Sequence, residues 1–242
     1  MTRTAMLLAA GRGKAMRPLS ELTAKSLLTL GGRSLIDYAL DTLAAAGVEK
    51  VKVVVNAHWH ADQVAQHLAV RHGPPETLLR REESLLDTGG GVHAALDLLG
   101  SEPFFVINGD SVWLEGPTPA LDRLRQAWTD EADAVLLVQR TCMTRSGGGM
   151  GDFALDPEGR VRRRREREVV PFVYAGVQLV SPALFAGAPE GPFSMNLAWD
   201  RAIEAGRLRA IVHDGLWFHL STPGDLAAAE TALRLRRTGQ SR

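Results

Sequence analysis

This sequence has little cysteine, no net charge and no long apolar run. Its 242 residues include one cysteine, Cys142, which excludes an intrachain disulfide bond and a metal site built from several cysteines. The 28 basic and 28 acidic residues cancel, so no overall field favours nucleic acid or an acidic membrane surface. No apolar run reaches the roughly 18 residues that a membrane-spanning helix needs. We therefore expect a cytoplasmic protein with neither nucleic acid nor membrane as a partner.

Two familiar nucleotide-binding motifs are also missing. The dinucleotide pattern Gly-x-Gly-x-x-Gly ends on Met16 instead of glycine, and the P-loop string Gly-x-x-x-x-Gly-Lys-Ser/Thr does not occur. A different loop is present, where Gly11 and Gly13 follow a short apolar run and are joined by Lys14 and Arg17. Backbone N–H groups of such a loop can turn inward around an anion while the cations add charge. We interpret it as a phosphate site; the alternative is a plain glycine-rich turn.

Strands and helices alternate through the first half of the chain. Apolar runs predict strands at 6–8, 51–56, 77–79, 104–107 and 134–138, and helical spacing predicts helices at 34–46, 61–70 and 92–99. Ser34 would cap the first helix and Gly47 would end it. This order predicts an α/β fold: one domain with a mostly parallel, partly mixed sheet and helices on both faces. Ligands bind at the carboxyl ends of such strands, where the Gly11 loop, Asn56 and Asn108 lie.

The second half changes character. Residues 146–151 form a glycine-rich linker, 152–167 read as a hairpin that turns at 156–159, and 172–180 predict a further strand. The segments 193–197 and 217–223 each precede a predicted helix. The basic run 162–167 is open to a nucleic-acid interpretation, but the neutral chain and the absence of interleaved aromatic residues favour a strand with an exposed charged face.

Two further segments suggest chemistry. Asp110 follows a predicted strand and lies in a turn of small residues, so its carboxylate would project where Mg²⁺ and phosphate groups meet. Thr88, Gly89 and Gly90 open a helix, where a backbone without side chains lets a base or phosphate approach. The alternatives are an aspartate that only caps a turn and a plain glycine-rich helix cap.

These motifs together resemble a known family. The string Leu-Ala-Ala-Gly-x-Gly-x-x-Met-Arg-Pro-Leu at 8–19, followed by Lys25 and by 31–36, resembles the opening of the sugar-1-phosphate nucleotidyltransferases, which join a nucleoside triphosphate to a sugar 1-phosphate and release pyrophosphate. Strings at 86–91, 151–153, 172–176 and 193–196 are most similar to the N-acetylmuramate-1-phosphate uridylyltransferase branch, which serves bacterial cell-wall recycling. Mannose-1-phosphate guanylyltransferases and glucose-1-phosphate thymidylyl- or uridylyltransferases share most of them and stay open as alternatives.

The resemblance implies a fold and a set of roles. The fold would be Rossmann-like and glycosyltransferase-A-like, with a nucleotide-binding half at 1–140 and a sugar-binding half at 141–242. The catalytic residues would be Lys25, Asp110, Arg17 and Lys14. The nucleotide would be bound by Leu8, Ala9, Ala10, Gly11, Gly13, Asn56, Thr88, Gly89, Gly90 and Asn108. The sugar would be bound by Asp152, Glu168, Tyr174, Gly176 and Asn196. Mg²⁺, or alternatively Mn²⁺, would be held by Asp110 and His219.

The chain departs from the family pattern at several positions. Ala15 stands where an arginine contacts the triphosphate, and Met150 stands where an arginine often precedes the glycine of the sugar site. His219 replaces a second metal aspartate and Ser221 a glycine; imidazole suits Mn²⁺ better than Mg²⁺, or His219 only packs and leaves Asp110 as the sole ligand. These changes keep a second hypothesis open, a binding protein with weakened turnover. Whether the chain is a monomer or a small homo-oligomer also stays open.

Overall fold

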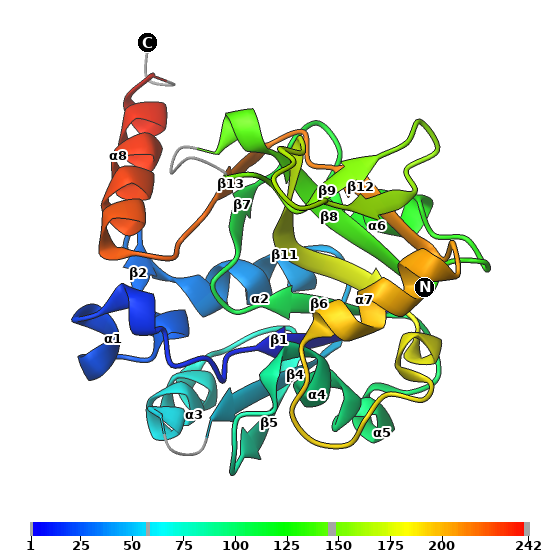
Figure 1. Ribbon diagram of the computed structural model, residues 1–242. Coiled ribbons are helices and arrows are strands. Elements are labelled where there is room, and N and C mark those ends of the chain that lie inside the picture. Colours follow the sequence, from blue (N-terminus) through cyan, green and yellow to red (C-terminus); the bar gives the residue numbers. More distant parts are fainter. Residues whose placement is uncertain (1, 57–58, 145–148, 240–242) are drawn as a thin grey trace.

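A nine-stranded sheet forms the centre of the molecule (Figure 1). The structure is a computed structural model and describes residues 2–56, 59–144 and 149–239. The strands of this sheet are β1 (Thr4–Leu8), β4 (Lys50–Asn56), β5 (Glu76–Glu82), β6 (Phe104–Asn108), β8 (Ala134–Arg140), β9 (Phe153–Leu155), β10 (Val161–Arg163), β11 (Phe172–Val180) and β12 (Leu208–Val212). The order β5-β4-β1-β6 is parallel throughout; β11 then runs antiparallel between β6 and β8, and β12 lies parallel to β8. The expected mixed, mostly parallel sheet is confirmed.

Helices cover both faces of the sheet. Those on one face are α2 (Leu35–Ala45), α3 (Ala61–Val70) and α6 (Ala120–Gln126), and those on the other are α4 (Asp87–His93), α5 (Leu96–Leu99) and α7 (Met195–Glu204). Two further helices are α1 (Leu19–Leu22) and α8 (Pro223–Gly239), and α8 packs in a separate hydrophobic cluster with β7 (Val112–Leu114). Successive residues of β1 point to opposite faces, as strand geometry requires. Leu7 joins the hydrophobic cluster under α2, α3 and α6, whereas Met6 joins the cluster under α4, α5 and α7. The sheet is therefore buried on both sides, which explains its nearly continuous apolar strands.

Two small antiparallel sheets complete the fold. One pairs β2 (Thr29–Leu30) with β3 (Arg33–Ser34), and the other pairs β7 (Val112–Leu114) with β13 (Leu216–Phe218). The second brings a late segment of the chain beside the turn that follows β6. Among the described residues, no helix combines the length and apolarity that crossing a membrane requires.

Several local predictions are confirmed by the geometry. Ser34 Oγ accepts the backbone N–H of Asp37 at 3.3 Å and caps α2, and Gly47 lies beyond its end with φ +73°. The hairpin of β9 and β10 is closed by a turn in which the N–H of Gly159 donates to the carbonyl of Asp156. Of the linker expected at 146–151, residues 146–148 lie outside the described part.

The helix predicted at 92–99 is wrong in its bounds. The chain is already helical from Asp87, and the helix stops at His93 before a short second helix, α5. The glycines were expected to open this helix, but the apolar spacing begins only at Val92, because the three glycines at 89–91 lower helix propensity and add no apolar side chain to the pattern. Tertiary packing of these glycines against residues 191–195, described below, overrides that propensity.

The two expected halves share one sheet. β11 from the second half pairs with β6 from the first, and β13 pairs with β7. One hydrophobic cluster likewise combines Leu7 with Val177. The assignment of nucleotide to residues 1–140 and sugar to residues 141–242 stays a prediction.

Candidate active site

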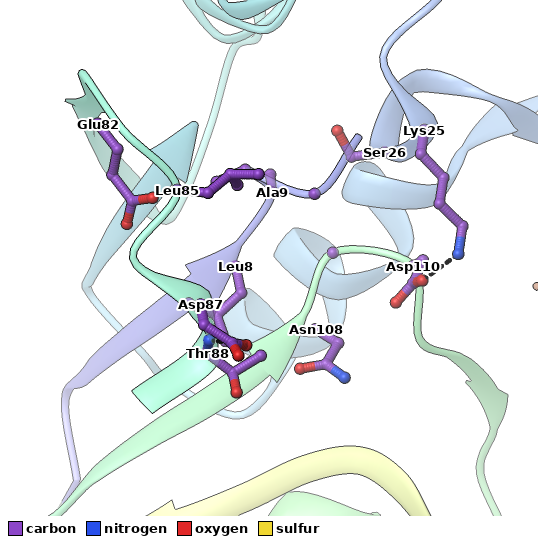
Figure 2. A pocket seen from close by; sticks show the side chains of 13 residues that line it. Leu8, Ala9, Lys25, Ser26, Glu82, Leu85, Asp87, Thr88, Asn108 and Asp110 are labelled. Atoms are coloured by element: carbon purple, nitrogen blue, oxygen red, sulfur yellow. Dashed lines mark hydrogen bonds and ion pairs between the residues drawn. The ribbon is translucent and has the colours of Figure 1, made fainter. Parts of the chain in front are cut away.

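A pocket of about 440 Å³ opens at the carboxyl ends of β1 and β6 (Figure 2). It is lined by Leu8, Ala9, Ala10, Gly11, Lys25, Ser26, Glu82, Leu85, Asp87, Thr88, Asn108, Gly109 and Asp110. The position agrees with the general rule for open α/β sheets. Eight of these residues were among the sequence-predicted site residues: Leu8, Ala9, Ala10, Gly11, Lys25, Thr88, Asn108 and Asp110. Asn56 ends β4 at the same edge of the sheet, but its side chain lies outside the described part.

The floor of the pocket is made by two strand ends in close contact. The N–H of Gly109 donates to the carbonyl of Leu8 at 2.8 Å, which continues the pairing of β1 and β6 by one step. A Cβ at residue 109 would lie 2.9 Å from that carbonyl oxygen, so only glycine fits without a shift. The turn can then bring Asp110 to the pocket wall.

Lys25 and Asp110 meet at one end of the pocket, as Figure 2 shows. Lys25 begins a single 3-10 turn at Lys25–Leu27, and its ammonium donates to Asp110 Oδ2. The side chains are 17% and 35% exposed, so the pair remains open to a ligand on the pocket side. The arrangement sets one cation and one anion side by side where phosphate groups were predicted.

Thr88 connects the pocket to α7. Its side chain lines the pocket, and its Oγ1 accepts the N–H of Met195 at 3.0 Å. The N–H groups of Gly89 and Gly90 both donate to the carbonyl of Phe193. A Cβ at Gly89 would overlap the Phe193 ring, and one at Gly90 would overlap the carbonyl oxygen of Gly191. Helix packing accounts for these two glycines, and their contact with a nucleotide stays a prediction.

Glu82 lines the pocket but was not among the site residues predicted from the sequence. It ends β5 with 5% of its surface exposed, and its Oε2 accepts the N–H of Leu86 at 3.3 Å. Burial raises the pKa of its carboxyl and outweighs the opposite effects of that hydrogen bond and of Arg80. Ser26, Leu85, Asp87 and Gly109 were missed as well. Ser26, Asp87 and Gly109 are adjacent in sequence to predicted site residues, whereas Leu85 is not.

The later residues of the glycine loop do not line the pocket. Lys14 and Arg17 are exposed and do not line the pocket, and Arg17 lies 3.4 Å from Glu21. Gly13 adopts φ +60° and packs against the side chain of Lys25. The catalytic roles expected for the two cations stay predictions.

Gly176 brings the predicted sugar residues closest to the pocket. It adopts φ +78° in a bulge of β11, and a Cβ there would overlap Ser111 Oγ and approach Asn108 Cβ to 3.3 Å. Two residues earlier, the N–H of Tyr174 donates to Asp152 Oδ2 at 2.9 Å, which fixes the start of β9 on β11. These contacts set the second half of the chain directly against the Asp110 turn.

The other predicted sugar residues contact neighbouring side chains, although the buried Tyr174 hydroxyl has no hydrogen-bond partner among the described residues. Burial raises the pKa of the Tyr174 hydroxyl, and the ring packs edge-on against Trp199 at 4.8 Å. Asn196 Oδ1 accepts a hydrogen bond from Arg163 at 2.9 Å. Glu168 is bound by Arg162, and that hydrogen bond lowers its pKa to about 2. Their roles in sugar binding stay predictions.

His219 lies outside the main pocket and lines a separate hollow of about 270 Å³ with Trp217 and Asp225. Its Nε2 is 2.8 Å from Ser221 Oγ. Phe218 pairs with Val112, and the same antiparallel register continued one step would set His219 opposite Ser111, one residue from Asp110. Its role as a metal ligand stays a prediction.

The pocket residues provide too few ligands for a magnesium ion unless phosphate oxygens supply the others. Within residues 2–56, 59–144 and 149–239, no group of three or more His, Cys, Asp or Glu side chains could hold a metal ion. Lys25 occupies Asp110 Oδ2, which leaves Oδ1 as an oxygen donor on the pocket wall. One carboxylate with phosphate oxygens and water is a common magnesium environment in proteins. Asp110 therefore suits Mg²⁺ when a phosphate substrate supplies the other oxygens.

Comparison with known proteins identifies the family to which this chain belongs. The family model of the MobA-like NTP transferase domain matches residues 5–212, so the chain belongs to this family of nucleotidyltransferases. Its full-length relatives are sugar-1-phosphate nucleotidyltransferases, which confirms the class predicted from the motifs.

Two relatives are similar to this chain over almost its whole length. The N-acetylmuramate alpha-1-phosphate uridylyltransferase of Caulobacter vibrioides is 40% identical over 236 residues, covering 96% of this chain and 97% of the relative. The protein of the same name from Neisseria meningitidis serogroup B is 31% identical over 229 residues, covering 93% and 96%. Among solved structures, UDP-glucose pyrophosphorylase complexed with UDP-glucose has a TM-score of 0.82 at 15% identity, covering 98% of this chain and 100% of the other. That likeness confirms the fold.

Proposed function

We propose that this protein transfers a uridylyl group from UTP to N-acetylmuramate 1-phosphate and releases pyrophosphate. The observation that carries the proposal is that the similarity to the two N-acetylmuramate alpha-1-phosphate uridylyltransferases extends over nearly the whole length of the chain. The product would be a UDP-activated amino sugar, in keeping with the reuse of cell-wall sugars that the motifs suggest.

The pocket supplies groups suited to this reaction. An oxygen of the sugar phosphate attacks the α-phosphorus of UTP, and the bond from that phosphorus to the β-phosphate oxygen breaks. One P–O bond forms and one is lost, and pyrophosphate leaves with the electron pair. No covalent enzyme intermediate is needed, so catalysis rests on positioning and on charge.

We assign roles from position in the pocket. Lys25 binds the attacking phosphate and orients it, because its ammonium lies on the pocket wall. Asp110 would hold the divalent cation. When bound, that cation neutralises charge on the phosphate oxygens.

Base choice is assigned to the opposite wall. Glu82 offers a buried carboxyl oxygen that can accept the imide N–H of uracil, a group that cytosine and adenine lack. The backbone at Leu8–Gly11 lies beside the triphosphate. Gly176 lies against Ser111 and against Asn108 of the pocket wall, and we assign the sugar to this side.

The test is pyrophosphate release across a matrix of substrates. UTP, dTTP, GTP and CTP are combined with N-acetylmuramate, N-acetylglucosamine, glucose and mannose 1-phosphates, in Mg²⁺ and in Mn²⁺. We expect UTP with N-acetylmuramate 1-phosphate to give the highest kcat/KM, by about 10-fold or more. Preference for glucose or mannose 1-phosphate would replace the proposed substrate. Nucleotide binding without turnover on any pair would support the binding-protein hypothesis raised by Ala15 and His219.

A further inference from the structure

The wall of the main pocket carries little positive charge for a triphosphate ligand. Its wall carries the carboxyl groups of Glu82, Asp87 and Asp110 but only one cation, Lys25, and that ammonium is already paired with Asp110. A nucleoside triphosphate adds several more negative charges at close range, where repulsion is strong. Besides the divalent cation assigned to Asp110, positive charge on a segment that borders the pocket would stabilise the bound state.

The segment 11–17 borders the pocket and carries three basic residues. Gly11 lines the pocket, and Arg12, Lys14 and Arg17 follow it. Arg17 is already close to Glu21, at 3.4 Å. Arg12 and Lys14 are exposed, and no carboxylate of the described residues pairs with either.

Arg12 and Lys14 differ in where they lie relative to the point at which this segment is fixed to the protein. The carbonyl of Gly13 accepts hydrogen bonds from Ser20 Oγ at 2.7 Å and from the N–H of Met16 at 2.8 Å. Met16 is fully buried, so the chain is fixed from Gly13 onward. At Gly11, in contrast, no atom lies within 4 Å of the place that a Cβ would take. Arg12 is the single residue between the pocket-lining stretch and this anchor, whereas Lys14 starts the turn beyond it.

We propose that Arg12 binds the β- and γ-phosphates of the nucleoside triphosphate, and that Lys14 and Arg17 contribute less. A guanidinium can bind phosphate oxygens through two parallel N–H bonds, which an ammonium cannot do. The open space beside Gly11 leaves room for phosphate groups next to the exposed Arg12 side chain. The identity of the nucleotide as UTP rests on the proposed function, but the role of Arg12 requires only a triphosphate.

The test compares binding of UTP with binding of UMP, measured by calorimetry with Mg²⁺ and without a sugar phosphate. UMP lacks the two phosphates that Arg12 would bind. We expect Arg12→Gln to weaken UTP binding by about 10- to 100-fold, the usual range for a lost hydrogen bond between charged groups, while UMP binding changes less than about twofold. Arg12→Lys should recover part of the loss. Lys14→Gln should weaken UTP binding by less than about threefold.

Arg3→Gln is the matched control. It removes the same charge from an exposed arginine at the opposite end of β1, and we expect it to change neither affinity. The proposal would be overturned if Arg12→Gln weakened the binding of UTP and UMP equally, or weakened neither. It would also be overturned if only Lys14→Gln selectively weakened UTP binding. Because no sugar phosphate is present, failure of N-acetylmuramate 1-phosphate as a substrate leaves this comparison intact.

Discussion

Lys25 and Asp110 form an ion pair between segments that lie 85 positions apart in the sequence. The ammonium uses Oδ2 of the carboxylate and leaves Oδ1 on the pocket wall. Each side chain thereby holds the other in place before any substrate arrives, which is the form of preorganisation that lowers the cost of binding charged groups. The pair also means that removing either partner exposes the charge of the other.

The first prediction concerns Asp110. Asp110→Asn keeps the shape but removes the charge that would hold Mg²⁺, so we expect kcat to fall by about 10²-fold or more. The Mg²⁺ concentration for half-maximal rate should rise as well. Pyrophosphate release at varied Mg²⁺ measures both. Asp97→Asn, at an exposed site on α5, is the control. Wild-type turnover at low Mg²⁺ in Asp110→Asn would show that the metal is held elsewhere.

The second prediction uses the buried carboxyl of Glu82. Its pKa is raised in the folded protein, so the folded state holds this proton more tightly than the unfolded state. Stability from this group is therefore lost as pH rises above the ordinary glutamate value of about 4.5, where the unfolded side chain ionises first. Glu82→Gln removes the cost of ionisation and keeps an acceptor for the N–H of Leu86. We expect its stability, relative to wild type, to increase from pH 4.5 to pH 7.

Urea unfolding across that pH range tests Glu82→Gln. Glu83→Gln is the matched control because Glu83 is the exposed neighbour. A stability difference that stays constant with pH, or that follows the same course in the Glu83 variant, would contradict a raised pKa at Glu82.

Local sequence determined most of the fold but only part of the site. Strands such as β6 are apolar on both faces, and α2 has a serine cap and a terminal glycine, so short windows of sequence suffice to recognise them. Glu82 could not be found in this way, because it ends a strand with two preceding arginines and looks solvated. Its burial depends on Gly91, where a Cβ would lie only 2.9 Å from Glu82 Oε1. That contact joins two elements and has no signature in either alone.

The third prediction concerns a polar cluster between α2 and α3. Asp37 Oδ2 accepts a hydrogen bond from Ser34 Oγ at 2.6 Å and lies 3.0 Å from His67 Nε2. Burial alone would raise the pKa of Asp37, but the hydrogen bonds from Ser34 and His67 and the charges of His67 and Arg71 outweigh it and lower the pKa. Asp37→Asn should destabilise the protein at pH 7 by about 1–3 kcal/mol, since charged hydrogen bonds are lost.

The pH dependence of this loss follows from the direction of the shift. A lowered pKa contributes stability above the ordinary aspartate value of 3.8, and that contribution disappears as pH falls through the lower folded value. The difference between wild type and Asp37→Asn should therefore shrink in acid, as urea unfolding at pH 7 and below pH 4 would measure. Asp62→Asn, at a side chain that is 91% exposed, should cost less than about 1 kcal/mol. A difference that is the same at both pH values would rule out a lowered pKa.

The fourth prediction concerns the bulge of β11. Gly176 combines φ +78° with a site where a Cβ would overlap Ser111 Oγ, beside the Asp110 turn. Gly176→Ala should therefore carry two costs: the backbone strain of a left-handed residue, about 1 kcal/mol or more, and a steric cost of about 1–3 kcal/mol. Because the clash pushes on residues next to Asp110, we also expect kcat to fall while UTP affinity changes little.

Gly187→Ala separates these two costs. Gly187 has φ +67° and no atom within 4 Å of the place that a Cβ would take, so alanine there meets the strain without the clash. It should lose only the smaller amount of stability and keep full turnover. In the double variant Gly176→Ala with Ser111→Ala, the overlapping oxygen is gone, and part of the lost stability and kcat should return. If Gly176→Ala cost no more than Gly187→Ala, or if removing the Ser111 hydroxyl gave no recovery, close packing of the bulge against the Asp110 turn would not explain the glycine.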